Sequence, residues 1–401
     1  MPNSETETRI FEYTSIGRVL FGAHAAKHTG TEAASLVQGR KCLLITDQGV
    51  LQAGLIDAVE SSLKTAGFNV DTCAEAKPEP SMANYEAVLQ VARSKNPDLL
   101  VGVGGGSSLD IAKAVSRALT SPRTLEEYLG REFDTPGIPV ITIPTTSGTG
   151  AEITPDAVVR LPEQRVKSGF YNARASLAIV DPTMTLTLPP RLTAATGVDA
   201  LAHAIESALS KTATPLTQAL ALGSISLVSR NLREATFNGN NLEARTNMAW
   251  ATLIEGFSES NAGDVEAHAV GHVLGGYYAV HHGEACGIAL PHCMTYNLPV
   301  NTPVLVRIAK AMDEHTSGEQ RLLAEKGIDA VRQLILDLGL PTSISEIQGA
   351  SQEHIPELVE LYCTHPDIVE ILDLFSKRGI PSQAEATRFI GKMFEPAPPI
   401  A

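Results

Sequence analysis

The sequence predicts an α/β domain with a parallel sheet over residues 1–190 and an all-α domain over residues 191–401. The chain has 401 residues, which exceeds one ordinary compact core and indicates two domains. In the first half, short apolar runs alternate with longer amphipathic runs, the pattern of strands separated by helices. After about residue 190, Ala- and Leu-rich stretches with a period near 3.6 predominate and indicate helices.

The apolar runs of the first half are the predicted strands. They lie at residues 41–46, 68–71, 98–103, 139–143 and 178–180. The amphipathic runs between them predict helices at residues 54–66, 82–94 and 108–120. Strands joined in this way pair in parallel through right-handed crossovers, with helices on both faces of the sheet. Ligands of such a sheet bind at the carboxyl ends of its strands.

The second half is predicted to begin after the pair Pro189-Pro190, which interrupts regular structure. Helices are predicted at residues 194–210, 216–233, 243–257, 264–279, 302–314, 319–338, 354–362 and 383–393. The pair Gly275-Gly276 is predicted to end the fourth of these helices, and His281-His282 is predicted to lie in the loop that follows.

Composition limits the classes of partner and the compartment. The formal net charge of −14 disfavours binding to nucleic acid or to an anionic membrane surface. No run of 18 apolar residues is present, and the polar N-terminus lacks the pattern of a signal peptide. Five cysteines without a CxxC pair indicate reduced thiols. A cytoplasmic protein is therefore expected.

A glycine-rich loop, Gly104-Gly105-Gly106-Ser107, follows the third predicted strand and opens a helix. Glycines let backbone amides approach an anion closely, and the helix N-terminus adds positive partial charge, so a pyrophosphate is the expected guest. The loop matches neither GxGxxG nor the P-loop pattern. An ordinary tight turn between strand and helix is the alternative.

Three further features support a Rossmann-like dinucleotide site. A second loop, residues 144–150, follows the next strand and carries the hydroxyls of Thr145 and Thr146. Asp47 ends the first strand, where a carboxylate binds ribose hydroxyls, repels a 2′-phosphate and so favours NAD over NADP. Lys167 is a cation for a ribose or a phosphate. A helix-capping role for Asp47 and a surface position for Lys167 are the alternatives.

Histidines cluster in the second half, where six of the 11 lie between residues 203 and 292. Asp199 and His203 are four residues apart in one predicted helix, and His268 and His272 are four apart in another. Residues at this spacing share one helix face. Carboxylate and imidazole together suit Fe²⁺, Zn²⁺ or a similar divalent ion. Buried structural histidines are the alternative interpretation.

Several motifs, spread over nearly the whole chain, resemble those of the iron-containing (group III) alcohol dehydrogenases. They are Phe21-Gly22, Thr46-Asp47, Pro78-Glu79-Pro80, GGGSSLD at 104–110 with Ala112-Lys113, PTTSGTGAE at 144–152, Asp181-Pro182, TAATGVDALAHAIE at 193–206, Asn261-Ala262-Gly263, residues 268–276 and His282-Gly283. The resemblance implies a dehydroquinate synthase-like architecture, in which the active site lies in the cleft between the two domains.

The resemblance also implies roles for particular residues. The implied metal ligands, for Fe²⁺ or another divalent ion, are Asp199, His203, His268 and His282. The implied contacts to NAD, or less favourably NADP, are Asp47, Gly104, Gly105, Gly106, Ser107, Thr145, Thr146, Lys167 and Leu186. His272 matches a histidine near the nicotinamide, and we expect it to relay a proton. A homodimer or larger homo-oligomer is implied as well.

The predicted reaction is hydride transfer between a small alcohol and a nicotinamide, assisted by a Lewis-acidic ion. A maleylacetate reductase-like relative without metal, a hydroxyacid–oxoacid transhydrogenase-like relative and, more distantly, a dehydroquinate synthase-like lyase are the alternatives. The chain departs from the family at Cys286-Gly287 and at His365-Pro366-Asp367, which leaves the substrate open. The predicted pocket residues are Phe257, Asp156, Cys286 and Cys363.

Overall fold

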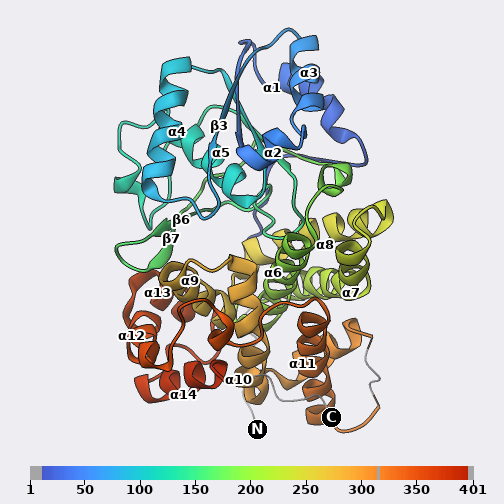
Figure 1. Ribbon diagram of the computed structural model, residues 1–401, viewed down its shortest axis with the longest axis vertical. Coiled ribbons are helices and arrows are strands. Elements are labelled where there is room, and N and C mark those ends of the chain that lie inside the picture. The colour runs from blue at the N-terminus through green and yellow to red at the C-terminus, as the bar shows by residue number, and fades with distance from the viewer. Residues whose placement is uncertain (1–10, 314–316, 396–401) are drawn as a thin grey trace.

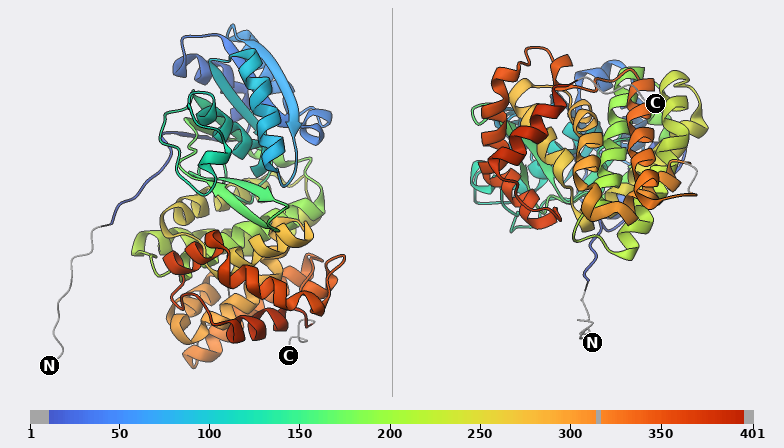
Figure 2. Two further views of the ribbon diagram at one scale, coloured as in Figure 1. Left: turned by 90° about the vertical axis from the view of Figure 1, so that its left-hand side faces the viewer. Right: turned by 90° about the horizontal axis from the view of Figure 1, so that it is seen from below.

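The computed structural model describes residues 11–313 and 317–395. Its α/β half and its helical half lie one above the other along the longest axis (Figure 1). A side view shows the same division, with a short β hairpin at the junction (Figure 2). The N-terminal α/β domain and the helical C-terminal region therefore agree with the predicted fold class.

The sheet of the α/β half has six parallel strands in the order β1-β8-β5-β4-β2-β3. Its strands are β1 (Val19–Phe21), β2 (Lys41–Asp47), β3 (Asn69–Ala76), β4 (Leu99–Gly104), β5 (Val140–Pro144) and β8 (Leu177–Val180). Neighbours β2, β4 and β5 end at Asp47, Gly104 and Pro144, so both predicted ligand loops leave the same edge.

Helices cover both faces of the sheet, and successive buried side chains of a strand point to opposite faces. Leu43 and Ile45 of β2 belong to one apolar core, and Cys42 and Leu44 belong to another. The first core includes α4 (Met82–Lys95) and α5 (Gly106–Ala118). The second core includes α1 (Thr29–Leu36) and α3 (Asp57–Thr65), while the short α2 (Gln48–Gln52) follows β2.

The five strands predicted in this half are confirmed, with β3 five residues longer at its carboxyl end than the apolar pattern indicated. The sequence did not reveal β1, which has only three residues and pairs along a single edge. It also missed the antiparallel hairpin of β6 (Ala157–Leu161) and β7 (Val166–Phe170). Arg160, Lys167 and Ser168 interrupt their short apolar runs, so neither strand gives the continuous apolar signal of β5 or β8.

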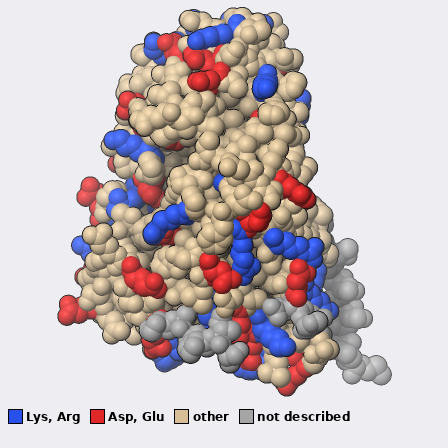
Figure 3. Space-filling view, turned by 45° about the vertical axis from the view of Figure 1, so that its right-hand side comes forward, with Lys and Arg blue, Asp and Glu red and all other residues tan. Residues whose placement is uncertain are grey.

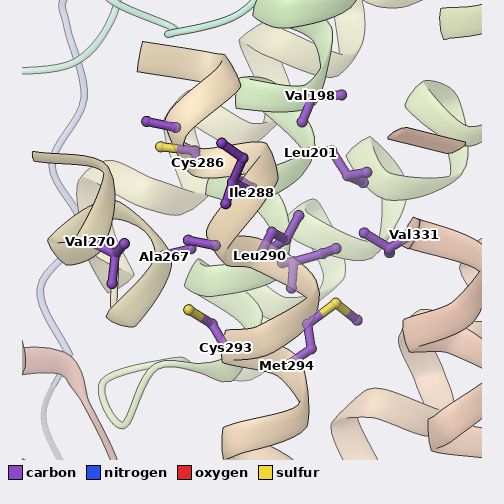
Figure 4. Packing of buried hydrophobic residues seen from close by; sticks show 14 of the residues in the cluster. Val198, Leu201, Ala267, Val270, Cys286, Ile288, Leu290, Cys293, Met294 and Val331 are labelled. Carbon is purple, nitrogen blue, oxygen red and sulfur yellow. The ribbon is translucent and has the colours of Figure 1, made fainter. Parts of the chain in front are cut away.

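The helical half packs around one large apolar core, where side chains from four of its helices meet (Figure 4). Its helices are α6 (Pro190–Leu209), α7 (Pro215–Phe237), α8 (Leu242–Ala262), α9 (Glu266–Tyr278), α10 (His282–Ala311), α11 (Gln320–Asp337), α12 (Ile355–Thr364), α13 (Pro366–Phe375) and α14 (Gln383–Met393). Pro190 occupies the first turn of α6, where a proline costs no hydrogen bond.

Two predictions about the middle of this half were wrong. The predicted helix at 302–314, whose last residue lies outside the described part, is the end of α10, which starts at His282 and contains Pro291, Pro299 and Pro303. Packing on α6 and α11 outweighs these prolines, so His282 lies in a helix rather than a loop.

The glycine pair was also misread as a helix end, because α9 continues through it to Tyr278. The glycines instead allow close contact with the β6–β7 hairpin. A Cβ on Gly276 would lie 2.3 Å from the backbone of Val166, and one on Gly275 would lie 2.9 Å from Lys167. The hairpin is thereby held against α9.

The two halves are joined by contacts between the sheet edge and α8. Ile16, Val180 and Leu253 share a small apolar core, and the rings of Phe21 and Trp250 stack with centroids 3.7 Å apart. Asn261, at the end of α8, exchanges two hydrogen bonds with the backbone of Thr14. The halves are therefore fixed to each other at the level of the strand ends.

Charged side chains of both signs are interspersed on the face shown in Figure 3, and most of that face carries neither. Within residues 11–313 and 317–395, no helix is long and apolar enough to cross a membrane.

A substitution at Gly283 tests the close packing that positions α10. A Cβ there would lie 2.0 Å from the carbonyl oxygen of Ala195 on α6. Gly283→Ala is therefore expected to lower the free energy of unfolding by about 1–3 kcal/mol in denaturant titrations. Gly391→Ala in α14 is the control, since its Cβ would meet nothing within 4 Å. Equal stability of Gly283→Ala and the unaltered protein would contradict this packing.

Candidate metal and dinucleotide site

A cavity of about 770 Å³ lies where the glycine-rich loop, the β6–β7 hairpin and the helical half meet. Gly106, Ser107 and Lys167 line it from the α/β half. His203, His268, His272 and His282 line it from α6, α9 and α10. The predicted phosphate loop and the predicted histidine cluster thus line the same cavity.

Three predicted metal ligands meet at one point. Oδ1 of Asp199 lies 3.9 Å from Nε2 of His268 and 3.8 Å from Nε2 of His282. Asp199 and His268 are both 2% exposed, and neither Oδ1 nor Nε2 has a hydrogen-bond partner within the described structure. Buried donors and acceptors without partners are costly, so these atoms are arranged for a ligand.

His203 belongs to an adjoining group that shares His268. Its ring lies 4.0 Å from the ring of His268, centroid to centroid, and its Nε2 lies 3.9 Å from Oδ2 of Asp264. One ligand atom each from His203, Asp264 and His268 lies within 4.8 Å of the others. Cys286, a predicted pocket residue, instead joins the group of Asp199, His268 and His282.

Glu206 fixes the orientation of His268 from behind. This carboxylate has no exposed surface. It accepts hydrogen bonds from the backbone N–H of Ala267 (2.5 Å) and of His268 (2.9 Å), and it lies 2.6 Å from Nδ1 of His268. It therefore caps the start of α9 and turns Nε2 of His268 toward Asp199. Glu206 was not predicted as a site residue, although it lies on the same face of α6 as Asp199 and His203, seven and three residues further on.

Burial sets the charge state of the cluster. It holds the pKa of His268 at about 3 and those of His203 and His282 well below their ordinary value. Burial also raises the pKa of Asp199 to about 7. The imidazoles are therefore neutral at physiological pH, the form in which histidine binds a metal.

The donor set fits a divalent cation. A hydrogen bond cannot span 3.8–3.9 Å, but two ligands of one ion, each about 2.0–2.2 Å from it, lie at such separations. One carboxylate with neutral imidazoles leaves a divalent ion only partly neutralised. The unpartnered oxygen of Asp199 and nitrogen of His268 both face this position.

The glycine-rich loop is shaped for a close approach of backbone to ligand. α5 begins at Gly106 after Gly105, whose backbone lacks a capping side chain. Gly104 has φ +155°, and a Cβ on it would lie 2.5 Å from Oγ of Ser108. A Cβ on Gly106 would lie 2.8 Å from Thr149 of the second loop. The open N-terminus of α5 fits an anionic group such as a phosphate.

The remaining predicted cofactor residues lie behind or beside the cavity lining. Asp47 caps α2 by accepting a hydrogen bond from the backbone N–H of Val50 (2.9 Å), while its other oxygen lies 3.4 Å from Ser108 Oγ. Thr145 is buried and donates its backbone N–H to Gly104. Thr146 lies against Gly105. Leu186 follows a 3₁₀ turn and is not among the cavity lining.

Lys167 reaches the cavity from β7 and is 3% exposed. It forms an ion pair with Glu79, which lies in a left-handed conformation (φ 51°) after β3. Burial opposes the charge of Glu79, but Lys167 holds the pKa of that carboxyl below its ordinary value. The sequence indicates Glu79 only as part of a motif, since no local pattern reveals a partner 88 positions away.

Of the predicted pocket residues, Asp156 lines the cavity. Phe257 packs against the small apolar core at the sheet edge, and Cys363 packs against the core of the helical half. Cys286 is fully buried behind His282.

Family models match most of the chain. One, described as iron-containing alcohol dehydrogenase, matches residues 17–182, and its C-terminal counterpart matches residues 193–369. The chain belongs to the iron-containing alcohol dehydrogenases. It is therefore an oxidoreductase of alcohols and aldehydes, and its family typically requires a metal and a nicotinamide cofactor.

Curated relatives of this alcohol dehydrogenase carry names for different alcohols. It is 38% identical to the 1,3-propanediol dehydrogenase of Klebsiella pneumoniae, over 88% of this chain and 92% of the relative. It is 38% identical to a choline dehydrogenase of Bacillus subtilis (84% and 85%) and 33% identical to an NAD-dependent methanol dehydrogenase of Bacillus methanolicus (88% and 95%).

Solved structures show the same fold. A 1,3-propanediol oxidoreductase superposes with a TM-score of 0.90 at 35% identity, covering 96% of this chain and all of the other. An alcohol dehydrogenase from Oenococcus oeni gives a TM-score of 0.90 at 30% identity, with the same coverage. The predicted family, fold class and type of enzyme are thus confirmed.

The buried carboxyls predict a pH-dependent stability of the metal-free protein. Burial raises the pKa of Asp199 to about 7 and that of Glu259 to about 8, against about 4 in an unfolded chain. The folded state then holds more protons than the unfolded one, so stability falls as the pH rises toward 8. The lowered pKa values of the histidines make stability rise with pH, but only at pH values below about 6.5.

The chelated protein is therefore expected to melt at a lower temperature at pH 8 than at pH 6.5, measured by calorimetry in matched buffers. Protein loaded with Zn²⁺ is the control, because a bound cation favours ionised Asp199 and reduces the loss. A melting temperature of the chelated protein that rises over this interval would contradict the assigned directions.

Proposed function

We propose that this chain is an NAD-dependent alcohol dehydrogenase whose divalent ion is held by Asp199, His203, His268 and His282. The observation that carries the proposal is the pair of buried, unpartnered ligand atoms on Asp199 and His268, which face His282 beside the cavity. When bound, the ion and the nicotinamide supply Lewis acidity and hydride acceptance. The family match supports Fe²⁺ as the native ion, with Zn²⁺ as the alternative.

His203, rather than Cys286, is proposed as the fourth ligand. His203 lines the cavity, whereas Cys286 is fully buried in the apolar core. Burial, and next the charge of Asp199, raise the pKa of the Cys286 thiol well above its ordinary value, which opposes the thiolate form that binds metals. The His203 ring lies beside that of His268, with 4.0 Å between the ring centroids, so it is close to the proposed ion.

The cofactor is proposed to lie across the carboxyl ends of β2, β4 and β5. Gly104, Gly105, Gly106 and Ser107 would bind its pyrophosphate at the start of α5, and Thr145 and Thr146 form the adjoining wall. Asp47 faces the same loop, where its carboxylate favours the ribose of NAD over the phosphorylated ribose of NADP. Lys167 and Leu186 complete the proposed contacts at the nicotinamide end.

His272 is proposed to relay the proton that leaves the alcohol. It lines the cavity beside His282, at 5.6 Å between ring centroids, and its Nδ1 is buried without a partner in the described structure. Burial, followed by the charge of Lys167, lowers the pKa of His272 well below its ordinary value. The ring is therefore neutral and a weak base, so it would pass a proton on to solvent rather than hold it.

A small alcohol or aldehyde is the proposed substrate, since relatives are named for propanediol, methanol and choline. A transhydrogenase-like relative would share the same metal ligands. Release of free NADH during turnover distinguishes the proposed alcohol dehydrogenase from such a transhydrogenase.

A cytoplasmic homo-oligomer is proposed as well. Trp250, Leu216 and Phe237 are 40%, 49% and 68% exposed and are available for contacts between subunits.

Metal removal tests the proposed ion site. NAD reduction is measured on a panel of alcohols before and after chelation, and again with Fe²⁺, Zn²⁺ or Mn²⁺ restored. Activity is expected to fall by at least about 100-fold on chelation and to return with one ion, since the Lewis acid contributes several kcal/mol. Asp199→Ala should be inactive with every ion. Full activity after chelation would assign the chain to the metal-independent reductase relatives instead.

Asp47→Asn tests the proposed NAD preference. Asparagine caps a helix as well as aspartate does, so α2 is kept while the negative charge is removed. The ratio of kcat/KM for NADP to that for NAD is expected to rise about tenfold, because a repulsion near the 2′-phosphate is relieved. The matched control is Asp57→Asn at the start of α3. An unchanged ratio would leave Asp47 as a helix cap alone.

A further inference from the structure

Part of the cavity lining is rich in carboxylates. Glu255 and Glu259 are four residues apart and share one face of α8, and Asp264 follows that helix. Asp156, from the α/β half, lines the same cavity, and its charge contributes to the raised pKa values of Glu259 and Asp264. Asp156, Glu259 and Asp264 line the cavity directly. We call these four residues the acidic wall.

The acidic wall lacks the partners that buried carboxylates require. Glu255 is 0% exposed, and neither of its oxygens has a hydrogen-bond partner in the described part of the chain. The same holds for Oε2 of Glu259 and Oδ1 of Asp264. Within that part, no lysine or arginine forms an ion pair with any of the four residues; the contacts of Asp264 are to His203 and His268. Isolated buried carboxylates are unstable as anions, so the wall needs a proton or a cation from elsewhere.

The basic side chains around the cavity are engaged elsewhere. Lys167 pairs with Glu79, and Arg160 donates to the carbonyl of Gly276. Arg174 donates to Asn172, and Arg131 is exposed at the rim. Lys113, buried below Asp156, pairs with Asp110 at 3.0 Å and also donates to backbone carbonyls. The charge of Lys113 acts on Asp156 and Glu259 from a distance, but within the described residues none of these cations forms an ion pair with the acidic wall.

Aromatic and aliphatic side chains frame the same region. Tyr171 and Phe375 line the cavity together with Leu374 and Ile371. The ring of Phe375 packs on Gly263, the residue before Asp264, where a Cβ would lie only 2.5 Å from it. Aromatic rings beside carboxylates bind alkylated ammonium groups, because the ring face attracts the charge and the methyl groups bury apolar area.

We propose that the acidic wall selects alcohols that carry a positively charged, alkylated ammonium group. The inference rests on the proposed function, because it places the hydroxyl at Asp199 and His268 and the ammonium against Glu259, Asp264 and Asp156. His203 lies between these two positions, 3.9 Å from Asp264, so one small molecule spans them. Glu255, one helical turn before Glu259, is fully buried and does not line the cavity.

The test compares choline with 3,3-dimethylbutan-1-ol, which has the same shape but a carbon in place of the charged nitrogen. NAD reduction by the metal-loaded, full-length protein is measured for both, and for 1,3-propanediol as a neutral reference. We expect kcat/KM for choline to exceed that of its neutral isostere by about tenfold or more, mainly through KM. Because the ratio compares two substrates on one protein, a partly unfolded preparation does not change it.

Glu259→Gln is expected to lower this ratio by about tenfold, because a bound ammonium favours the ionised form of Glu259 and glutamine cannot ionise. Asp156→Asn, from the other half of the molecule, is the second variant if Glu259→Gln does not fold. Glu243→Gln is the matched control, because Glu243 is exposed in the first turn of the same helix α8. It should keep the ratio of the unaltered protein.

Three results would overturn the proposal. Turnover of the neutral alcohols with no preference for choline removes the cation selectivity but leaves the alcohol dehydrogenase. Absence of turnover on every alcohol removes both. Equal turnover, together with calorimetric Mg²⁺ binding that Glu259→Gln abolishes, assigns the wall to an inorganic cation.

Discussion

The carboxylate of Glu206 is the contact on which the site depends. It satisfies two backbone N–H groups at the start of α9 and contacts Nδ1 of His268, all without exposed surface. Losing it would leave three buried polar groups unpaired, which costs about 1–3 kcal/mol for each. Glu206 and Asp199 lie on one face of α6. This helix therefore supplies the carboxylate of Asp199 to the proposed metal position and, through Glu206, orients the ring of His268 toward it.

The glycines complete this arrangement by removing side chains where helices and hairpin must touch. Gly283 lets the start of α10 rest on the backbone of α6, which brings His282 to 3.8 Å from Asp199. Gly276 lets the β6–β7 hairpin reach α9, which carries Lys167 to the histidines. Close backbone contacts therefore position His282 and Lys167 at one cavity, while the packing of the sheet edge on α8 holds the two halves together.

Much of the fold was predictable from local pattern, because buried parallel strands and amphipathic helices repeat with distinct periods. The glycine-rich loop and the Asp199/His203 pair were also predictable from local pattern. The run of glycines indicates a turn, and the spacing of four residues indicates one helix face. The acidic wall was not, because its members come from residues 156, 255, 259 and 264 and acquire meaning only once the halves pack. His282 was misplaced in a loop because prolines within α10 concealed the helix.

The central claim is that one carboxylate and three imidazoles, with no thiolate, surround one ion. X-ray absorption spectroscopy of the Zn²⁺-loaded protein tests it most directly, because Cys286 lies within 4.8 Å of three of these ligands and His203 lies in the adjoining group. The account predicts nitrogen and oxygen neighbours at about 2.0–2.2 Å, with the multiple-scattering pattern of imidazole. A sulfur neighbour at about 2.3 Å would show that Cys286 has replaced His203 and would contradict the proposed site.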